Sequence, residues 1–230
     1  MAGKRRFDDP CGVARALGVV GERWALLVVR ELLLGPKRFT ELSRGLPGLS
    51  QNVLSQRLRE LEESGVVRKR RLGPPVSATA YELTELGALL DPVLISLATF
   101  GSRLPLPSAE TPMSADAFVL ALRTTFDPDA SKTKRDGTFE LRLDDDVFRA
   151  SIQDGTFKVA RGIATAPDAV ITGSVAAVRA VVFGGRPLTE GARPSTEGGR
   201  SLTEEVQVSG DRRAAERFVR LFPRPATVTG

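Results

Sequence analysis

The segment from Ser50 to Gly65, SQNVLSQRLRELEESG, constrains the fold more than any other part of the chain. Ser50 can cap a first helical turn, leucines follow at helical spacing, and Gly65 provides the left-handed residue that ends a helix. The pattern therefore predicts one short amphipathic helix. Its face opposite the leucines carries Asn52, Ser55, Gln56 and Arg59. Such side chains hydrogen-bond base edges and phosphates, although a solvated surface face can have the same composition.

The residues before this helix favour contact with DNA. A short helix is predicted from Phe39 to about Gly45, with Thr40 as its cap. Leu46-Pro47-Gly48 then turns the chain into the Ser50 helix. A short helix, a tight turn and a second helix with a polar outer face form the helix-turn-helix arrangement.

Two strands are predicted directly after the Ser50 helix, at residues 66–72 and 78–83, around a turn at Gly73-Pro74-Pro75. The first strand carries four consecutive bases, at positions 68–71. An isolated run of this kind is typical of a solvated edge strand. Its position after the helix instead predicts the wing of a winged helix, whose bases reach phosphates.

Two helices are predicted upstream of the helix-turn-helix. Asp9 can cap the first helix, Pro10 fits its first position, and Cys11 then lies in its first turn. The run ERWALLVVRELLLG is apolar nearly all round, as in a helix at the centre of a bundle, and Gly35-Pro36 ends it.

A last helix of this half is predicted from Glu85 to about Arg103, with Thr84 as its cap and a kink at Pro92. It carries more apolar residues than one small domain can cover, which indicates a dimer seam. The predicted seam residues are Leu90, Val93, Leu94, Leu97 and Phe100.

The charge distribution separates the two halves of the chain. Lys and Arg number 33 against 28 Asp and Glu, and residues 1–104 hold 16 of these bases and 11 of the acids, so the remainder holds 17 of each. A net charge confined to the half with the Ser50 helix is expected where one domain meets a polyanion. No apolar run reaches the roughly 18 residues of a membrane span, so the chain is predicted to be cytoplasmic and nucleoid-associated, with no membrane partner.

The composition offers few residues that could act in catalysis or bind a metal. The chain has one Cys and no His, which excludes an internal disulfide framework, His-based triads and the usual metal sites. No catalytic residue, metal ligand or cofactor is therefore predicted, and an enzyme is the least favoured class.

Residues 10 to 103 resemble the HxlR-type winged helix-turn-helix regulators of bacteria. The resemblance rests on the early Cys, the RW pair, REL, LLG-P-RF, ELSRGLPGLS, LSQRLRELEESGVV and YELTELG, in the family's order and spacing. It implies a homodimeric transcription factor that binds pseudo-palindromic double-stranded operator DNA. The implied contact residues are Thr40, Ser50, Gln51, Asn52, Ser55, Gln56, Arg57, Arg59, Arg68, Lys69, Arg70 and Arg71. The family also includes thiol sensors at the position of Cys11, whose other interpretation is a small packing residue.

The second half begins after a Pro-rich linker at residues 105–112. The predicted order of elements is a helix, a meander of strands, a strand, a helix, a strand and a final helix. This order is typical of an α+β domain, which is predicted over 113–230. A Gly-rich, polar excursion is predicted at 189–200 and a strand at 202–208.

Residues 113–224 are similar to the sterol carrier protein type 2 fold. The similarity rests on DAVITGS before a helix, on a Gly-Gly pair that ends this helix, and on the final segment VSGDRRAAERFVRLF. That resemblance implies an apolar tunnel for a hydrophobic small-molecule effector. The implied pocket residues are Phe118, Leu122, Phe139, Leu141, Phe148, Ile152, Phe183 and Phe218.

The whole chain is thus predicted to be multidomain, a mainly α winged helix-turn-helix domain at 1–104 followed by an α+β sterol-carrier-like domain. The favoured function is a ligand-responsive dimeric repressor. One alternative is a redox or electrophile sensor that acts through Cys11, with a structural second domain. Another is a hydrophobic-ligand carrier whose winged helix binds protein, which the basic wing and the polar helix face argue against.

Overall fold

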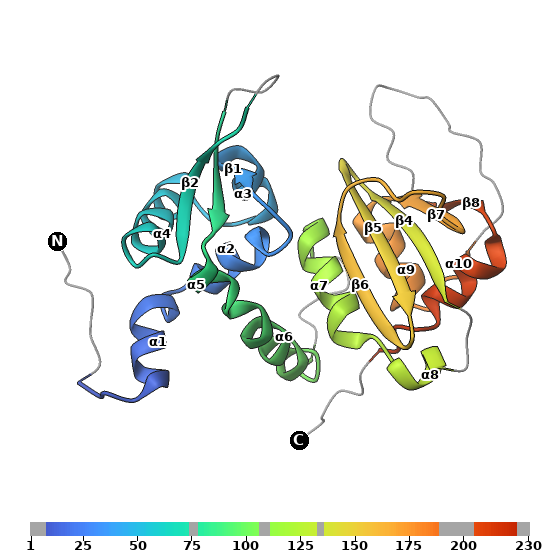
Figure 1. Ribbon diagram of the computed structural model, residues 1–230, viewed down its shortest axis with the longest axis horizontal. Coiled ribbons are helices and arrows are strands. Elements are labelled where there is room, and N and C mark those ends of the chain that lie inside the picture. The colour runs from blue at the N-terminus through green and yellow to red at the C-terminus, as the bar shows by residue number, and fades with distance from the viewer. Residues whose placement is uncertain (1–7, 74–77, 106–110, 133–135, 189–204, 225–230) are drawn as a thin grey trace. The chain divides into compact units, whose positions relative to one another are not determined.

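The computed structural model describes residues 8–73, 78–105, 111–132, 136–188 and 205–224. The predicted wing tip at 74–77, most of the linker and the excursion at 189–200 lie outside these ranges. The chain divides into two compact units, Met1–Leu94 and Ile95–Gly230 (Figure 1), and the division falls within one helix.

The first unit combines helices with a small antiparallel sheet, as a winged helix requires. Its helices are α1 (Gly12–Val20), α2 (Ala25–Leu32), α3 (Phe39–Gly45), α4 (Gln51–Glu63), α5 (Glu85–Ala88) and α6 (Leu90–Gly101), the last of which continues into the second unit. The strands β1 (Lys37–Arg38), β2 (Val67–Arg71) and β3 (Thr79–Leu83) pair in the order β1-β3-β2. Strand β1 is too short to be read from an alternating pattern and was not predicted.

The starts of two helices differ from the sequence prediction. Helix α1 begins at Gly12, and Cys11 is its N-cap, with Sγ accepting a hydrogen bond from the Ala14 amide at 3.2 Å. Asp9 instead accepts from the Cys11 amide. Helix α3 begins at Phe39, so Thr40 lies inside the helix and was wrongly predicted as its cap. The Arg38 amide there donates to the side chain of Glu41 at 2.6 Å, which satisfies the helix end without a hydroxyl cap.

The predicted long helix after Thr84 is two helices, separated at Leu89. Pro92 explains the break, because its ring has no N–H to bond the carbonyl of Ala88 and would clash with that carbonyl in a continuous helix. Helix α5 therefore ends at Ala88, and the kink predicted at Pro92 lies one turn earlier.

Helix α6 presents two different apolar faces. Leu94 is buried in the core of the first unit and Leu90 packs against that core, so Leu94 was wrongly predicted as a seam residue. Val93, Leu97 and Phe100 are exposed instead, Phe100 to 65%. The spacing i, i+4 places Leu90 and Leu94 on one side of the helix, and the three exposed residues follow at i, i+4 and i+7 on another.

The core of the first unit encloses one carboxylate. Glu31 of α2 is completely buried, and its side chain pairs with Lys37 at 2.7 Å and Arg30 at 2.8 Å. Gly45 at the end of α3 lies against the same carboxylate, where a Cβ atom would overlap Glu31 Oε2. The buried charge is thus compensated by two bases, and glycine at position 45 leaves room for the carboxylate.

The second unit is a mixed five-stranded sheet with helices. Its helices after α6 are α7 (Ala115–Thr125), α8 (Pro128–Lys132), α9 (Val175–Val182) and α10 (Arg212–Val219). The strands β4 (Gly137–Leu143), β5 (Asp146–Gln153), β6 (Thr156–Arg161), β7 (Ala169–Gly173) and β8 (Gln207–Gly210) pair in the order β6-β5-β4-β7-β8. Among the strand pairs that the structure describes in this unit, only β4 and β7 are parallel. The α+β prediction agrees with this separate sheet-containing unit.

Two elements of the second unit differ from the prediction. The last strand is described from Gln207 to Gly210, and residues 202–204 of the predicted strand lie outside the described ranges. Gly210 has a φ of +86° and lies close to the Asp168 carbonyl, which suits glycine. A short helix, α8, follows Pro128 where only a helix end was predicted, with Asp127 Oδ1 accepting from the amide of Ala130.

The inward face of the sheet forms an aromatic core. The ring centroids of Phe139 and Phe218 lie 4.6 Å apart, and those of Phe118 and Phe183 lie 6.0 Å apart in a T-shaped arrangement. All of the predicted pocket residues except the half-buried Phe183 are buried. Phe139 packs on Phe218, and Phe118 packs on Phe183.

Candidate nucleic-acid interface

Helix α4 begins and ends where its sequence predicts. The Ser50 hydroxyl accepts from the Val53 amide at 3.4 Å. Gly65, with φ +73°, ends the helix: its amide bonds the Glu62 carbonyl, and the Val66 amide bonds the Leu61 carbonyl. This double closure sets the direction in which the chain leaves α4 toward β2.

The outer face of α4 is polar and exposed. Leu54, Leu58 and Leu61 are buried beneath it. The exposed residues of the predicted contact set on and before α4 are Thr40, Ser50, Gln51, Asn52, Gln56 and Arg59, whereas Ser55 is half-buried. Arg59 Nη2 donates to Gln56 Oε1 at 2.9 Å, and Gln56 Nε2 donates to Glu60 Oε1 at 2.7 Å. This chain of bonds holds the amide and guanidinium groups on the surface of the helix.

Arg57 is placed differently from the other predicted contacts. Its side chain is mostly buried and pairs with Glu60 and, at 3.7 Å, with Glu22 of the turn before α2. The helical spacing puts Arg57 beside Leu54 and Leu58 rather than opposite them. Arg57 therefore joins α4 to the body of the unit.

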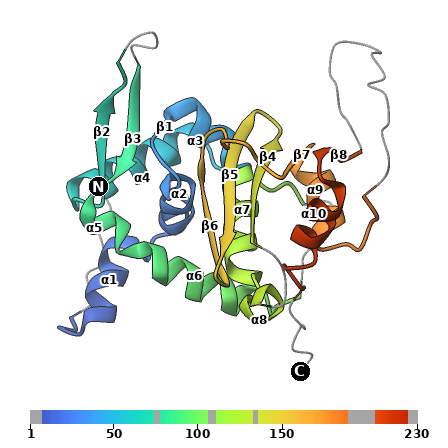
Figure 2. The same ribbon diagram turned by 45° about the vertical axis from the view of Figure 1, so that its right-hand side comes forward.

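The basic wing stands directly beside α4, as Figures 1 and 2 both show for β2 and β3. Glu82 of β3 bonds Arg68 at 2.8 Å and Arg70 at 3.1 Å across the hairpin. Lys69 points to the other face, where it bonds Glu62 of α4 at 2.9 Å and lies over the Tyr81 ring. Arg71 is exposed and pairs with no acid among the described residues.

These contacts shift two ionisation equilibria. Hydrogen bonds from Arg68 and Arg70 hold the pKa of Glu82 below its ordinary value. The hydrogen bond to Glu62 raises the pKa of Lys69. Both shifts favour the charged forms of Glu82 and Lys69. Glu62 and Glu82 were not predicted from the sequence as partners of the wing bases. The pairing of Glu82 with Arg68 could have been found, because the two residues lie opposite each other in the hairpin.

Two further features of the chain bear on function. Cys11 is exposed at the start of α1. Within the residues that the structure describes, no helix is long and apolar enough to cross a membrane, and no three potential ligands gather into a metal site.

Comparison with known proteins identifies the first unit. A family model described as HxlR-like helix-turn-helix matches residues 19–107. The HTH-type transcriptional regulator YkvN of Bacillus subtilis is 41% identical over 91 residues, which cover 40% of this chain and 77% of YkvN. YodB, an HTH-type transcriptional regulator of the same bacterium, is 38% identical over 78 residues, covering 34% of this chain and 70% of YodB.

A solved structure of the reduced form of YodB from B. subtilis, 32% identical, covers 44% of this chain and 99% of its own, with a TM-score of 0.38. The matched relatives are transcriptional regulators and not enzymes. The family match ends at residue 107, so most of the second unit lies beyond it. With a helix-turn-helix, an adjoining basic wing and these relatives, the chain belongs to the HxlR-like helix-turn-helix family of transcriptional regulators.

Proposed function

We propose that this regulator binds pseudo-palindromic operator DNA as a homodimer and represses transcription. The observation that carries the proposal is the exposed polar face of α4 with the basic strand β2 directly after it. A helix of this kind enters the major groove while a basic hairpin contacts the flanking phosphates. The proposed DNA contacts are Thr40, Ser50, Gln51, Asn52, Ser55, Gln56, Arg59, Arg68, Lys69, Arg70 and Arg71.

We expect Arg59→Ala to weaken binding to the cognate operator by about 1–3 kcal/mol and to relax base preference at one position, because a guanidinium that reads a base edge is lost. Arg71→Ala should weaken all DNA sequences alike and reduce the salt slope by about 1, because it removes a phosphate contact. Operator fragments captured from genomic DNA by the full chain provide the probe, and fluorescence anisotropy over a salt series provides the affinities.

Arg213→Ala is the matched control, since Arg213 is an exposed arginine on α10 in the other unit. Its affinity and salt slope should equal those of the unsubstituted protein. Binding by the Arg59 and Arg71 variants that equals this control on every sequence would remove α4 and the wing as the DNA-contacting surface.

We further propose a division into a DNA-binding and dimerisation domain at 1–104, a linker at 105–112 and an effector domain at 113–230. The effector domain is proposed to be sterol-carrier-like and to take an apolar small molecule. Its support is a sheet face lined by buried aromatic residues beneath α10. Because Phe139 and Phe218 contact each other, an apolar ligand would have to separate them and replace their contacts.

Cys11 supports a second candidate, a thiol sensor. Its sulfur is exposed and accepts a hydrogen bond from the Ala14 amide at the N-terminus of α1. An electrophile or oxidant that modifies this sulfur would remove the N-cap of α1. The second unit would then serve for packing alone.

Operator release separates the two sensors. An effector that releases DNA must bind the free protein more tightly than the DNA complex. We expect palmitate to reduce operator affinity equally in the unsubstituted chain and in Cys11→Ser, and benzoquinone to change neither. Anisotropy titrations of both proteins with both compounds make the measurement. Release by benzoquinone that disappears in Cys11→Ser, without any effect of palmitate, would assign sensing to the thiol.

A further inference from the structure

The recognition helix α4, the wing and helix α5 meet at one residue, Thr84. It lies between the end of β3 at Leu83 and the start of α5 at Glu85. Its amide donates to the Val66 carbonyl at 3.0 Å. Its hydroxyl donates to the Gly65 carbonyl at 2.5 Å and accepts the Gly87 amide at 3.1 Å. One side chain thus bonds the backbone where α4 ends and where α5 begins.

The backbones at this junction are in direct contact. A Cβ atom at Gly87 would overlap the Val66 carbonyl oxygen, so only glycine lets α5 approach the first residue after the α4 stop so closely. Gly65 and Val66 are themselves fixed by their bonds to the last turn of α4. The Thr84 hydroxyl therefore ties α5 and β3 to a rigid point of the recognition helix.

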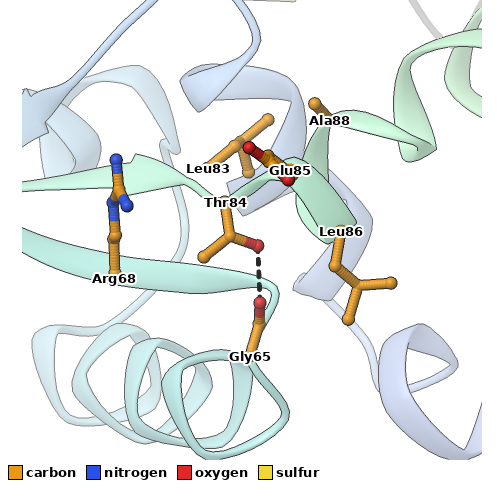
Figure 3. Close-up of a pocket in the computed structure, with 7 residues that line it drawn as sticks. All are labelled: Gly65, Arg68, Leu83, Thr84, Glu85, Leu86 and Ala88. Carbon is orange, nitrogen blue, oxygen red and sulfur yellow. Dashed lines mark hydrogen bonds between the residues drawn. The ribbon is translucent and has the colours of Figure 1, made fainter.

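A few side chains hold the wing to the body of the unit: Tyr81 and Leu83 pack against the core, and Lys69 bonds Glu62 of α4. In β2 only Val67 is buried, and in β3 only Ala80 is buried. Figure 3 shows the Thr84 hydroxyl directed at the Gly65 carbonyl in a surface pocket, with Arg68 of the wing and Leu86 of α5 on either side. Hydrogen bonds at the root of the hairpin act together with these contacts in setting its direction relative to α4.

We propose that Thr84 is a positioning residue for DNA binding, which fixes the angle of the basic wing relative to α4. The inference rests on the proposed function. Loss of the hydroxyl leaves the polar face of α4 and the wing bases unchanged in composition but allows the hairpin to move. Phosphate contacts made by Arg71 then become weaker, while contacts made by α4 remain.

The test compares Thr84→Val, which keeps the shape and removes the hydroxyl, with Thr84→Ser, which keeps the hydroxyl. We expect Thr84→Val to lower operator affinity roughly fivefold to tenfold, the loss of about one hydrogen bond, and to reduce the salt slope. Thr84→Ser should stay within about twofold of the unsubstituted chain because the same bond can form. Circular dichroism melting confirms that each variant is folded at the assay temperature.

A double-mutant cycle with Arg71→Ala distinguishes positioning from general support of the fold. If Thr84 acts through the wing, Arg71→Ala costs clearly less affinity in the Thr84→Val background than alone. A lower melting temperature with unchanged operator affinity and salt slope in folded Thr84→Val would overturn the proposal, as would full additivity of the two substitutions. Absence of DNA binding by the unsubstituted chain would instead contradict the proposed function itself.

Discussion

Replacing Glu31 with Ala is expected to lower the free energy of unfolding by about 3–5 kcal/mol, because it removes a completely buried acid that pairs with Lys37 and Arg30. The Glu31 carboxylate is completely buried and pairs with Lys37, whose side chain is itself nearly buried, and with Arg30. Removal also opens a space beside Gly45, which the carboxylate now fills. Urea unfolding followed by circular dichroism measures the change.

Glu63→Ala is the control for this experiment, since Glu63 is an exposed acid on α4, and we expect a change within about 0.5 kcal/mol. Glu31→Gln tests the charge separately from the volume and should also be destabilising. A Glu31→Ala protein as stable as the control would show that the ion pairs do not support the fold.

The sequence predicted the helix-turn-helix well because its signals are local. Ser50, Gly65 and the leucine spacing each act within one or two turns, so they determine α4 without knowledge of the tertiary structure. Cys11 shows where such reasoning ends. A cysteine is an uncommon N-cap, and the Asp9-Pro10 pair before it was the stronger local signal, so the start of α1 was placed two residues too early.

The sequence pattern of α6 did not show which side of this helix faces the core of the first unit. Leu90, Val93, Leu94, Leu97 and Phe100 are all apolar, and periodicity alone gives two overlapping stripes. Only the packing of α6 on the rest of the unit separates the buried Leu94 from the exposed Leu97. The ion pair of Arg57 with Glu22 was likewise not readable from the local pattern, because Glu22 is distant in sequence.

The second unit was predicted at the level of strands and inward faces. Alternation in β4 and β5 identified Phe139, Leu141, Phe148 and Ile152, all of which are buried. Alternation reports which side chains point inward, but it does not report whether they leave a cavity. The pocket inferred for these residues therefore stays a proposal.

The exposed face of α6 carries the second large prediction. Val93, Leu97 and Phe100 leave an apolar stripe in solvent, and Leu89 before α6 is exposed to 67%. A contiguous apolar surface of this kind on a helical regulator is the expected seam of a homodimer. In a two-fold interface each residue is buried twice, so Leu97→Glu with Phe100→Glu removes four apolar side chains, each worth about 1.5–3 kcal/mol when fully buried.

We expect the Leu97→Glu, Phe100→Glu variant to be monomeric, with a dimer dissociation constant raised at least about a hundredfold, because introduced carboxylates would also be desolvated in the seam. Operator binding should fall with it, since a monomer occupies one half-site while a dimer places two α4 helices about 34–36 Å apart. Sedimentation velocity measures the oligomeric state, and anisotropy on full and single half-site DNA measures binding.

Ile163→Glu is the matched control, because Ile163 is an exposed apolar residue outside α6, on the chain after β6. It should leave both measurements unchanged. Leu94→Ala tests a different property, since Leu94 lies in the core of the first unit, and should reduce stability by about 2–5 kcal/mol. A Leu97→Glu, Phe100→Glu protein that remains dimeric would place the seam elsewhere. A demonstrated monomer that keeps the full operator affinity would separate DNA binding from dimerisation, because two linked half-site contacts could not then explain the affinity.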